Sequence, residues 1–552
     1  MSKLLKLIEV KQKGEAYSEH PPSRWGNRDI YPIIPAERTY RWHDFFAYWF
    51  TAGICLSAYT LGSSLIAIGL TAGQALGAVL LGASFASLTA FLCGEAGRIH
   101  FIGYTMMGRA TWGLYGSYLC IALSCIQSLI YFGIQSYYGG QAVVLILNAL
   151  SPSFLHMRNT LPDSAAITTP YLIGFLVYMA VSTPVVMVPP HKLGRLLLPV
   201  FGVTCVCFAG LLGWALHANG GPGNLVSPSI SITPLAGRYA FVQGISQVAG
   251  AYTGGSVRLS DWTRFTKTPM APRVGMVIAQ PISLTIGALV GVLVTSATYE
   301  LYGVLEWNPL VLLAYVQGIQ YTAACRAGTF FLGLGFLGSQ IFVNMTQNCV
   351  STGMDLAGSL PRFVTLRRGG FIVSVVGLVI QPWRFLTQAT TFLSVIGSFG
   401  VFIAPMTAIL VSDFWLVRHR KLKIPDLYKR DGIFWYHYGL NWKAFLVFFA
   451  CIAPSLPGFI NSVNPSVKIP EGVYHFFQCT YFFGYTSALV LFFVISTVFP
   501  PPGNRIMETM DDNIIQGFEP AGAAEEAESI DKKATDSDGK PGLASDVVPT
   551  EV

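Results

Sequence analysis

Long apolar segments separated by short polar loops dominate the chain between residues 43 and 499. A helix that crosses a bilayer needs about 20 mostly apolar residues. Twelve segments approach or exceed this length, so the pattern predicts an all-α polytopic membrane protein with about twelve transmembrane helices. The predicted spans cover residues 45–70, 74–97, 114–149, 170–188, 196–217, 239–258, 274–298, 329–359, 371–388, 391–417, 443–461 and 475–499.

The composition agrees with this interpretation. Hydrophobic residues make up 52% of the chain and charged residues only 11%, whereas soluble proteins carry roughly a quarter charged residues. The ten cysteines lie in or beside apolar segments without a CxxC pair, and the nine histidines form no HExxH motif. These patterns favour neither a disulfide framework nor a metal site. With no nucleophile–base pair visible either, an enzyme is the least favoured class.

Basic residues concentrate in every second loop, which predicts the orientation. Cytosolic loops of membrane proteins are enriched in Lys and Arg. The loops between the basic ones carry few of these residues, and the loop at 218–235 carries none. Such an alternation requires an even number of spans with both termini in the cytosol. The basic loops are those near residues 98–109, 192–195, 264–273, 362–368 and 418–430.

Two polar segments flank the span region. Residues 1–42 are polar and basic without an apolar leader, and we predict a cytosolic segment. Residues 500–552 carry twelve acids against four bases, a net charge of −8, so the rest of the chain is +15. The basic balance therefore reflects membrane topology and predicts no nucleic-acid partner. The tail composition predicts a disordered acidic cytosolic segment. Its lysines either accept ubiquitin from ubiquitin-ligase machinery or belong to a solvated tail that only keeps the chain soluble; they are Lys532, Lys533 and Lys540.

A hexapeptide recurs in the first and sixth spans. Residues 58–63 read AYTLGS and residues 251–256 read AYTGGS. Transporters built from inverted repeats break the first helix of each repeat near mid-membrane, where freed backbone groups hold substrate and ion. The echo predicts a break in both spans, with the glycines unwinding the sixth. Its tyrosines, Tyr59 and Tyr252, are candidates for stacking on a ligand.

Polar side chains inside the third and eighth spans are the second candidate for a site. Tyr131 and Gln135 are four residues apart and share one helix face. Asn348 lies in the eighth span. Amides are costly in hydrocarbon and turn toward a partner helix or a wet cavity. They match the donor and acceptor edge of a heterocycle, and a tyrosine offers a stacking face; interhelical hydrogen bonding explains them equally well.

Charged residues within or beside the spans are candidates for coupling or gating. Arg258 and Asp261 end the sixth span and Asp355 lies in the eighth. Intramembrane ionisable residues often serve proton relays, although these carboxylates can also simply pair with neighbouring arginines. Asp29, in the segment before the first span, is a candidate for an inner gate.

Five short motifs are spread along the chain: NRDIYP at 27–32, SDWTRF at 260–265, GMDL at 353–356, RRGG at 367–370 and GLNWK at 439–443. Together they resemble the nucleobase:cation symporter 1 family, in its fungal uracil/allantoin permease branch. The resemblance implies two inverted five-helix repeats, at about 45–217 and 239–417, and two extra helices at about 443–499. It also implies proton-coupled uptake of nucleobases or related heterocycles at the plasma membrane.

Site residues also follow from the resemblance. Family members stack substrate on a tryptophan of the third helix and bind it with a glutamine four residues later; these positions hold Tyr131 and Gln135. The substrate asparagine of the eighth helix, seven residues before an aspartate, falls on Asn348. A Tyr-Ser pair of uracil and allantoin carriers aligns with Phe399 and Gly400.

Further departures from the family pattern bear on the ion and on the substrate. Where sodium-coupled members carry hydroxyls, this chain has Phe342 and Val343, which favours a proton over sodium as the coupling ion, with no other cofactor. Residues 353–358 and 391–401 are more similar to thiamine and nicotinamide riboside carriers. A cationic vitamin would need an acidic partner, and none lies beside Tyr131 or Gln135 in the sequence.

The sequence therefore predicts a proton symporter that imports uracil, uridine, allantoin or an oxopurine by alternating access. A thiamine or nicotinamide riboside transporter is the alternative. A channel would need a continuous polar path through several spans, and a nutrient sensor would bind such a ligand without transporting it.

Overall fold

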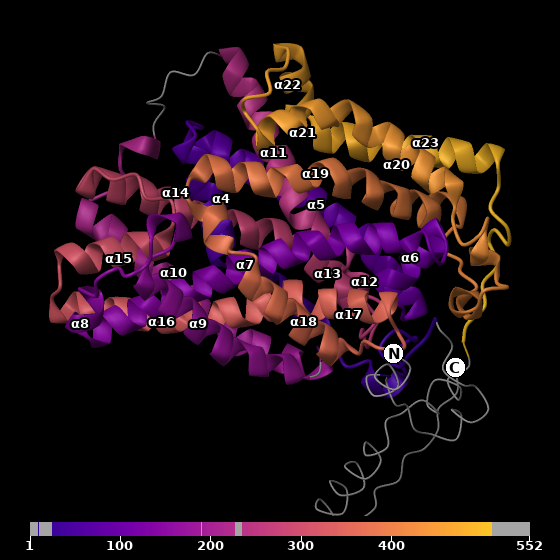
Figure 1. Cartoon of the computed structure of the whole chain (residues 1–552), viewed down its shortest axis with the longest axis horizontal. Helices are drawn as coiled ribbons and strands as arrows, with labels where there is room; N and C mark the ends of the chain where they lie inside the picture. The colour runs from indigo at the N-terminus through magenta and orange to yellow at the C-terminus, as the bar shows by residue number, and fades with distance from the viewer. Residues whose placement is uncertain (1–8, 10–24, 189, 227–233, 511–552) are drawn as a thin grey trace, which may run out of the picture.

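The computed structural model describes residues 9, 25–188, 190–226 and 234–510. The predicted acidic tail lies outside these residues from 511 onward. Within them the chain is almost entirely helical, and its only extended pairings are isolated bridges (Figure 1). The predicted all-α architecture is confirmed.

The helices of the first predicted repeat run through residue 219. The membrane-length members are long because their sequences stay predominantly apolar over the length that a crossing needs. Their bounds are α3 (Trp42–Gly53), α4 (Leu56–Ala67), α5 (Ala72–His100), α6 (Tyr104–Trp112), α7 (Ser117–Leu150), α8 (Pro152–Leu155), α9 (Thr169–Ser182) and α10 (Pro190–Asn219).

The remaining helices belong to the second predicted repeat and the extra pair. Their bounds are α11 (Pro234–Val257), α12 (Ser260–Thr263), α13 (Ala271–Val274), η5 (Gly275–Ala279), α14 (Gln280–Tyr302), α15 (Pro309–Ile319), α16 (Ala323–Asn344), η6 (Met345–Cys349), α17 (Val350–Ser359), α18 (Leu366–Val379), η7 (Pro382–Leu386), α19 (Ala389–Val411), η8 (Ser412–Val417), α20 (Trp442–Ile452), α21 (Leu456–Val463), α22 (Glu471–Gln478) and α23 (Thr480–Val498).

Nine helical stretches of the described chain are long and apolar enough to cross a membrane, and a bent pair raises the number to ten. The predicted sixth and ninth spans coincide with α11 and α18, which do not meet that test. α18 is only 14 residues long and is followed at Pro382 by the short helix η7. α11 carries Arg238, Gln243 and Gln247. The count of twelve stays a prediction.

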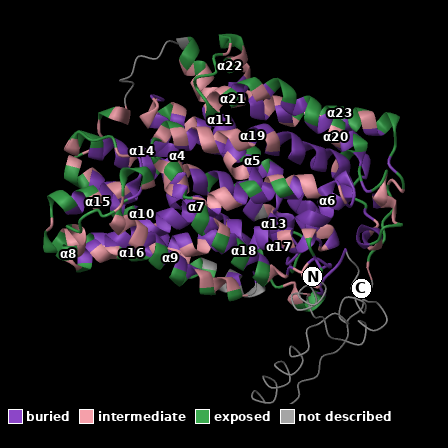
Figure 2. Ribbon diagram, viewed as in Figure 1, coloured by how far each residue is buried: buried purple, intermediate pink, exposed green. Residues whose placement is uncertain are grey.

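Helices from the two predicted repeats pack against each other. α5 contacts α11, α7 contacts α16, and α4 contacts α14. The extra helix α23 lies along α19 at the edge of the bundle (Figure 1). Buried residues line the inside of the bundle, and exposed residues alternate with partly buried ones on its outside (Figure 2).

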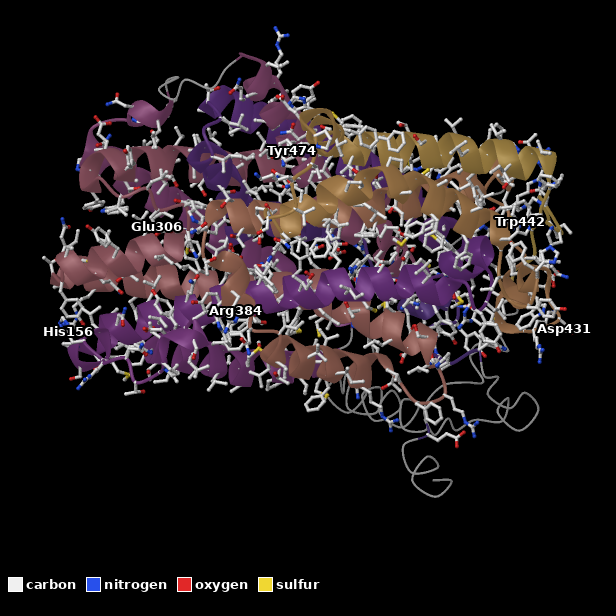
Figure 3. All side chains as sticks on the ribbon, turned by 45° about the horizontal axis from the view of Figure 1, so that its top comes forward. His156, Glu306, Arg384, Asp431, Trp442 and Tyr474 are labelled. Atoms are coloured by element: carbon white, nitrogen blue, oxygen red, sulfur yellow. The ribbon has the colours of Figure 1, made fainter. Side chains whose placement is uncertain are left out.

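The two described ends of the chain meet at one end of the bundle. Tyr428 donates a hydrogen bond to the carbonyl of Ile30 at 2.9 Å. Four residues earlier, the amide of Ile424 donates to the carbonyl of Glu508 at 2.9 Å. Asp431, in the same loop region, lies at the opposite end of the molecule from His156 (Figure 3).

The two similar hexapeptides differ in where the helix break lies: the break precedes AYTLGS at 58–63 and follows AYTGGS at 251–256. The first predicted span is broken, because α3 and α4 meet at Ile54 and Cys55 with a bend of 40°. The break predicted at the glycines of the sixth span is wrong. α11 continues to Val257, and the interruption falls at Arg258 and Leu259.

The glycines of the sixth span serve close packing instead of unwinding. A Cβ on Gly250 would lie 3.0 Å from the Cα of Gly400 on α19. A Cβ on Gly254 would lie 1.9 Å from the Gln127 Oε1 on α7. Small residues at such positions let helix backbones approach closely within a membrane, and α11 therefore stays helical.

Candidate functional site

A cavity opens at the break between α3 and α4, where these helices face α7, α11, η6 and α19. It contains about 700 Å³ of empty space, including space open to solvent. The broken helix contributes side chains from both of its halves. The polar and aromatic lining residues are Trp49, Ser57, Gln127, Ser128, Tyr131, Gln135, Tyr252, Arg258, Gln347, Asn348 and Phe392.

Four of the predicted substrate residues line this cavity: Tyr131, Gln135, Tyr252 and Asn348. Tyr131 and Gln135 point the same way because they are one helical turn apart on α7. The Nε2 of Gln135 donates to the Ser57 Oγ at 2.6 Å, which ties the amide to the first turn of α4. The Oε1 of Gln135 has no hydrogen-bond partner in the described chain.

Asn348 is oriented by a second asparagine. Its Nδ2 donates to the Oδ1 of Asn344 at 3.0 Å. Asn344 in turn donates to the carbonyl of Phe132 at 3.1 Å and to the Oγ of Ser136 at 2.9 Å, both on α7. Asn348 belongs to η6, a π-helical turn, and such turns are frequent at functional sites.

Six buried polar atoms of the lining residues lack a hydrogen-bond partner in the described chain. Buried polar groups are nearly always paired, so a cluster of unpaired ones indicates a place for a ligand or for water. The set contains donors, acceptors and hydroxyls, and none of its members is charged. The atoms are the Trp49 Nε1, Gln127 Oε1, Tyr131 Oη, Gln135 Oε1, Tyr252 Oη and Gln347 Nε2.

Two predicted substrate residues lie elsewhere. Tyr59 is fully buried on the other side of α4, where its ring meets Phe208 at 6.3 Å. Phe399 lies outside the cavity lining, and its ring centroid is 5.7 Å from that of Tyr131. Phe399 therefore touches the stacking candidate rather than the cavity.

The sequence analysis missed Trp49 and Ser57. They lie on opposite sides of the break, five residues before Ile54 and two after Cys55. A helix break exposes side chains on both of its flanks, so the predicted break was the signal that pointed to them.

Arg258 and Asp355 form a charged layer at the edge of the cavity. The Nη1 of Arg258 lies 3.3 Å from the Oδ2 of Asp355, and both side chains are almost completely buried. Arg258 also donates to the carbonyl of Gly254 at 3.1 Å, to the Oγ1 of Thr352 at 3.3 Å and to the Oγ of Ser128. Arg258 lines the cavity and thereby connects it with Asp355.

Asp261 and Asp29 lie in a second set of contacts. The Oδ1 of Asp261 accepts from the backbone N–H of Tyr104 at 2.9 Å. Asp29 accepts from Arg264 through its carbonyl and from the backbone N–H of Leu366 through its Oδ2, both at 2.9 Å. Asp29 thus joins the segment after the sixth predicted span to the start of α18.

The sequence matches the family described as "Permease for cytosine/purines, uracil, thiamine, allantoin" over residues 32–484. The chain belongs to this family. It is 32% identical to the transporter aclS of Aspergillus oryzae, covering 94% of this chain and 93% of that protein. It is 30% identical to nicotinamide riboside transporter 1 of Saccharomyces cerevisiae, covering 91% of this chain and 83% of that protein.

The fold is also that of a solved transporter. The closed structure of Mhp1, a nucleobase-cation-symport-1 family transporter with bromovinylhydantoin bound, has a TM-score of 0.66 and 21% sequence identity. The alignment covers 87% of this chain and 98% of Mhp1. The predicted transporter fold is confirmed, and the chain is a multi-pass membrane permease.

Proposed function

We propose that this permease is a proton-coupled importer of a neutral heterocycle with an amide edge, such as uracil, uridine, allantoin or an oxopurine. We further propose that it works at the plasma membrane with both termini in the cytosol. The observation that carries the proposal is the cavity at the α3/α4 break. Its unpaired polar atoms are all neutral, and the aromatic side chains of Tyr131 and Trp49 line it.

Recognition follows from the chemistry of these groups. The Oε1 atoms of Gln127 and Gln135 accept hydrogen bonds from ring N–H groups, and the Nε2 of Gln347 donates to a ring carbonyl. Tyr131 and Trp49 offer faces for stacking. A cyclic amide or ureide presents N–H and C=O groups side by side, so it can satisfy both kinds of partner at once.

A cationic vitamin is the second candidate, because one relative is named as a nicotinamide riboside transporter. The lining residues of the cavity, all within the described chain, contain no Asp or Glu, whereas Arg258 is among them. A cation in that cavity would lie beside the Arg258 guanidinium, and the carboxylate of Asp355 is already paired with that arginine. The electrostatics therefore favour a neutral ligand.

Coupling is assigned to the pair of Arg258 and Asp355. A proton on Asp355 weakens the ion pair and leaves Arg258 free to change partners beside the ligand. Because Arg258 contacts α7 through Ser128 and α17 through Thr352 and Asp355, this exchange alters how α11 is held against both helices. The contacts of Asp29 then have to open before substrate leaves toward the cytosol.

Competitive uptake in a fungal strain that lacks its own pyrimidine, purine and thiamine carriers tests the function. We expect saturable uptake of labelled uracil that uridine, allantoin or uric acid inhibits, and that thiamine does not. A protonophore should abolish uptake, and replacement of sodium should leave it unchanged. Growth rescued only by thiamine or nicotinamide riboside would contradict the proposed substrate. Strict sodium dependence would contradict the proposed ion, and ligand binding without transport would indicate a sensor.

A further inference from the structure

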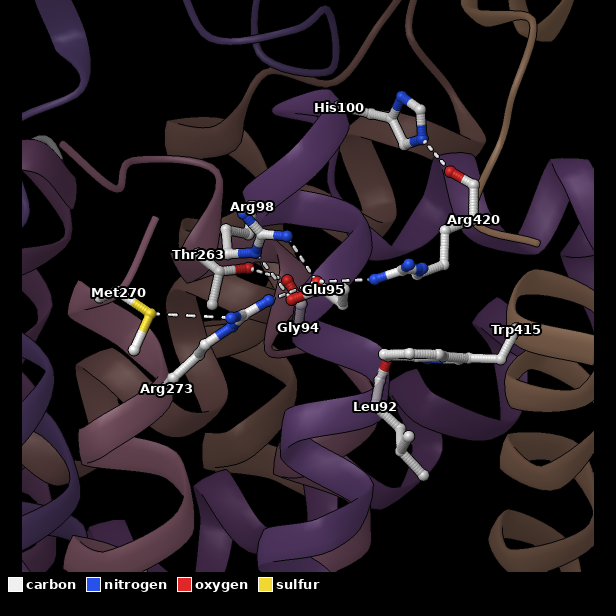
Figure 4. A network of polar contacts seen from close by, with 10 residues as sticks. All are labelled: Leu92, Gly94, Glu95, Arg98, His100, Thr263, Met270, Arg273, Trp415 and Arg420. Atoms are coloured by element: carbon white, nitrogen blue, oxygen red, sulfur yellow. Dashed lines mark hydrogen bonds and ion pairs between the residues drawn. The ribbon is translucent and has the colours of Figure 1, made fainter. Parts of the chain in front are cut away.

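A buried carboxylate at one end of the bundle collects three arginines from three different parts of the chain. The side chain of Glu95, on α5, is 2% exposed. Its Oε1 lies 2.5 Å from the Nη2 of Arg98, 3.0 Å from the Nη2 of Arg273 and 3.7 Å from the Nη1 of Arg420. Figure 4 shows the three guanidinium groups converging on it from α5, α13 and the loop after η8.

Three guanidinium groups face a single carboxylate, so the cluster carries a net charge of +2. The carboxylate is buried, whereas the side chains of Arg98, Arg273 and Arg420 are 15%, 34% and 46% exposed. Their cationic ends therefore remain accessible to an anion from outside. In addition, the Nε of Arg273 is buried without a hydrogen-bond partner in the described chain. The cluster has both charge and donors left over after Glu95 is bound.

The cluster lies near the ends of three helical stretches that are long and apolar enough to cross a membrane. These are Ala72–His100, Ala271–Tyr302 and Ala389–Val417. Beside it, the ring of Trp415 lies under the Arg420 guanidinium at 5.1 Å, and its Nε1 donates to the carbonyl of Leu92 at 2.8 Å. Tryptophan is enriched at the boundary between hydrocarbon and headgroups.

Exposed apolar side chains lie on the membrane side of the cluster. Leu88, seven residues before Glu95 on the same helix, is 54% exposed. Val277 and Ile278, about one turn after Arg273, are 54% and 55% exposed. A surface with an apolar wall and a cationic rim matches a phospholipid, whose acyl chains meet the wall while its phosphate meets the rim.

We propose that Arg98, Arg273 and Arg420 form a binding site for the phosphate of an anionic phospholipid headgroup. Arginine suits the role because its planar fork binds phosphate oxygens in pairs. Basic pockets between transmembrane helices on the cytosolic side select anionic lipids, and all three arginines lie in basic stretches of the sequence that the charge pattern assigns to the cytosolic side. A bound phosphate neutralises the excess charge and bridges α5, α13 and the loop after η8.

The test measures lipid binding to the purified full chain in detergent, without reference to transport. The probes are short-chain phosphatidylserine and phosphatidylcholine, titrated and counted by native mass spectrometry. We expect the anionic lipid to bind more tightly. Arg273→Gln and Arg420→Gln should each weaken its binding about fivefold, while binding of phosphatidylcholine stays unchanged. Arg384→Gln is the matched control. Arg384 is an exposed arginine near the end of the predicted span 371–388, and its replacement should leave phosphatidylserine binding unchanged.

Glu95→Gln should change the affinity for phosphatidylserine in the opposite direction from the arginine variants. It removes the competing negative charge, so binding of phosphatidylserine should tighten. Equal phosphatidylserine affinity in the wild type and both arginine variants would overturn the proposal and leave the cluster as an ionic tie between helices. Displacement of the lipid by millimolar inorganic phosphate would also overturn it, because the occupant would then be the free anion.

Discussion

The cavity and the charged layer at its edge differ in how far their polar groups are paired. In the cavity, the amide oxygens of Gln127 and Gln135 and the indole nitrogen of Trp49 have no hydrogen-bond partner in the described chain. In the charged layer, Arg258 makes contacts with four residues of three helices. Unpaired neutral groups are available to a ligand, whereas paired charges hold helices together. This difference in pairing is the basis for proposing that the cavity recognises the substrate and that the Arg258–Asp355 pair couples its transport to protons.

The largest effect is expected from the charged layer. Asp355→Asn removes the proposed proton-binding group, so concentrative uptake should fall to background while ligand binding persists. The measurement is proton-driven accumulation in proteoliposomes, compared with ligand binding by the same preparation. An Asp355→Asn variant that still accumulates substrate along an imposed proton gradient would place coupling elsewhere.

A second buried ion pair provides the matched control. Arg418 and Asp413 lie 2.9 Å apart and are about as buried as Arg258 and Asp355. Removing one partner of such a pair costs about 3–5 kcal/mol of stability, so Asp413→Asn should lower the amount of folded protein. The molecules that do fold should keep a normal ratio of accumulation to binding, because this pair does not touch the cavity.

The next effect concerns the cavity itself. Gln135→Ala and Asn348→Ala each delete an amide and leave a polar group of the ligand unpaired, a loss of about 1–3 kcal/mol or roughly 5- to 150-fold in affinity. Uptake at low substrate concentration should be lost while delivery to the cell surface persists, as judged by a fluorescent fusion. Normal uptake in either variant would contradict the assignment of the site.

Two adjacent glycines of α11 distinguish cavity geometry from helix packing. A Cβ on Gly254 would collide with the Gln127 amide at 1.9 Å, whereas a Cβ on Gly255 would lie 3.1 Å from the Gln347 Oε1. Since a side-chain amide can rotate away, Gly254→Ala should fold but displace Gln127 from the cavity. We expect a severalfold rise in KM for Gly254→Ala and a smaller change for Gly255→Ala. Equal KM values in the two variants would show that Gln127 is not a ligand group.

The sequence predicted those parts of this architecture that depend on local patterns. Apolar length located the spans, and the four-residue spacing correctly placed Tyr131 and Gln135 on one face. The break in the sixth span was misplaced, because glycine permits both unwinding and close packing, and only the neighbour at Gly400 decides between them. Trp49 reaches the cavity through the bend at the α3/α4 break, a tertiary feature that periodicity does not contain.

The smallest effect is expected at the hydroxyl of Tyr131. Its ring lines the cavity and packs against Phe399, but its Oη has no hydrogen-bond partner in the described chain. Tyr131→Phe therefore keeps the stacking face and removes one unpaired buried group, so thermal stability should hold or rise slightly. If stacking is the role of this ring, KM should change by less than about threefold, which corresponds to about 0.6 kcal/mol, near the lower end of what one neutral hydrogen bond contributes. Tyr131→Ala, which removes the face as well, should raise KM far more; equal losses in the two variants would assign the role to the hydroxyl instead.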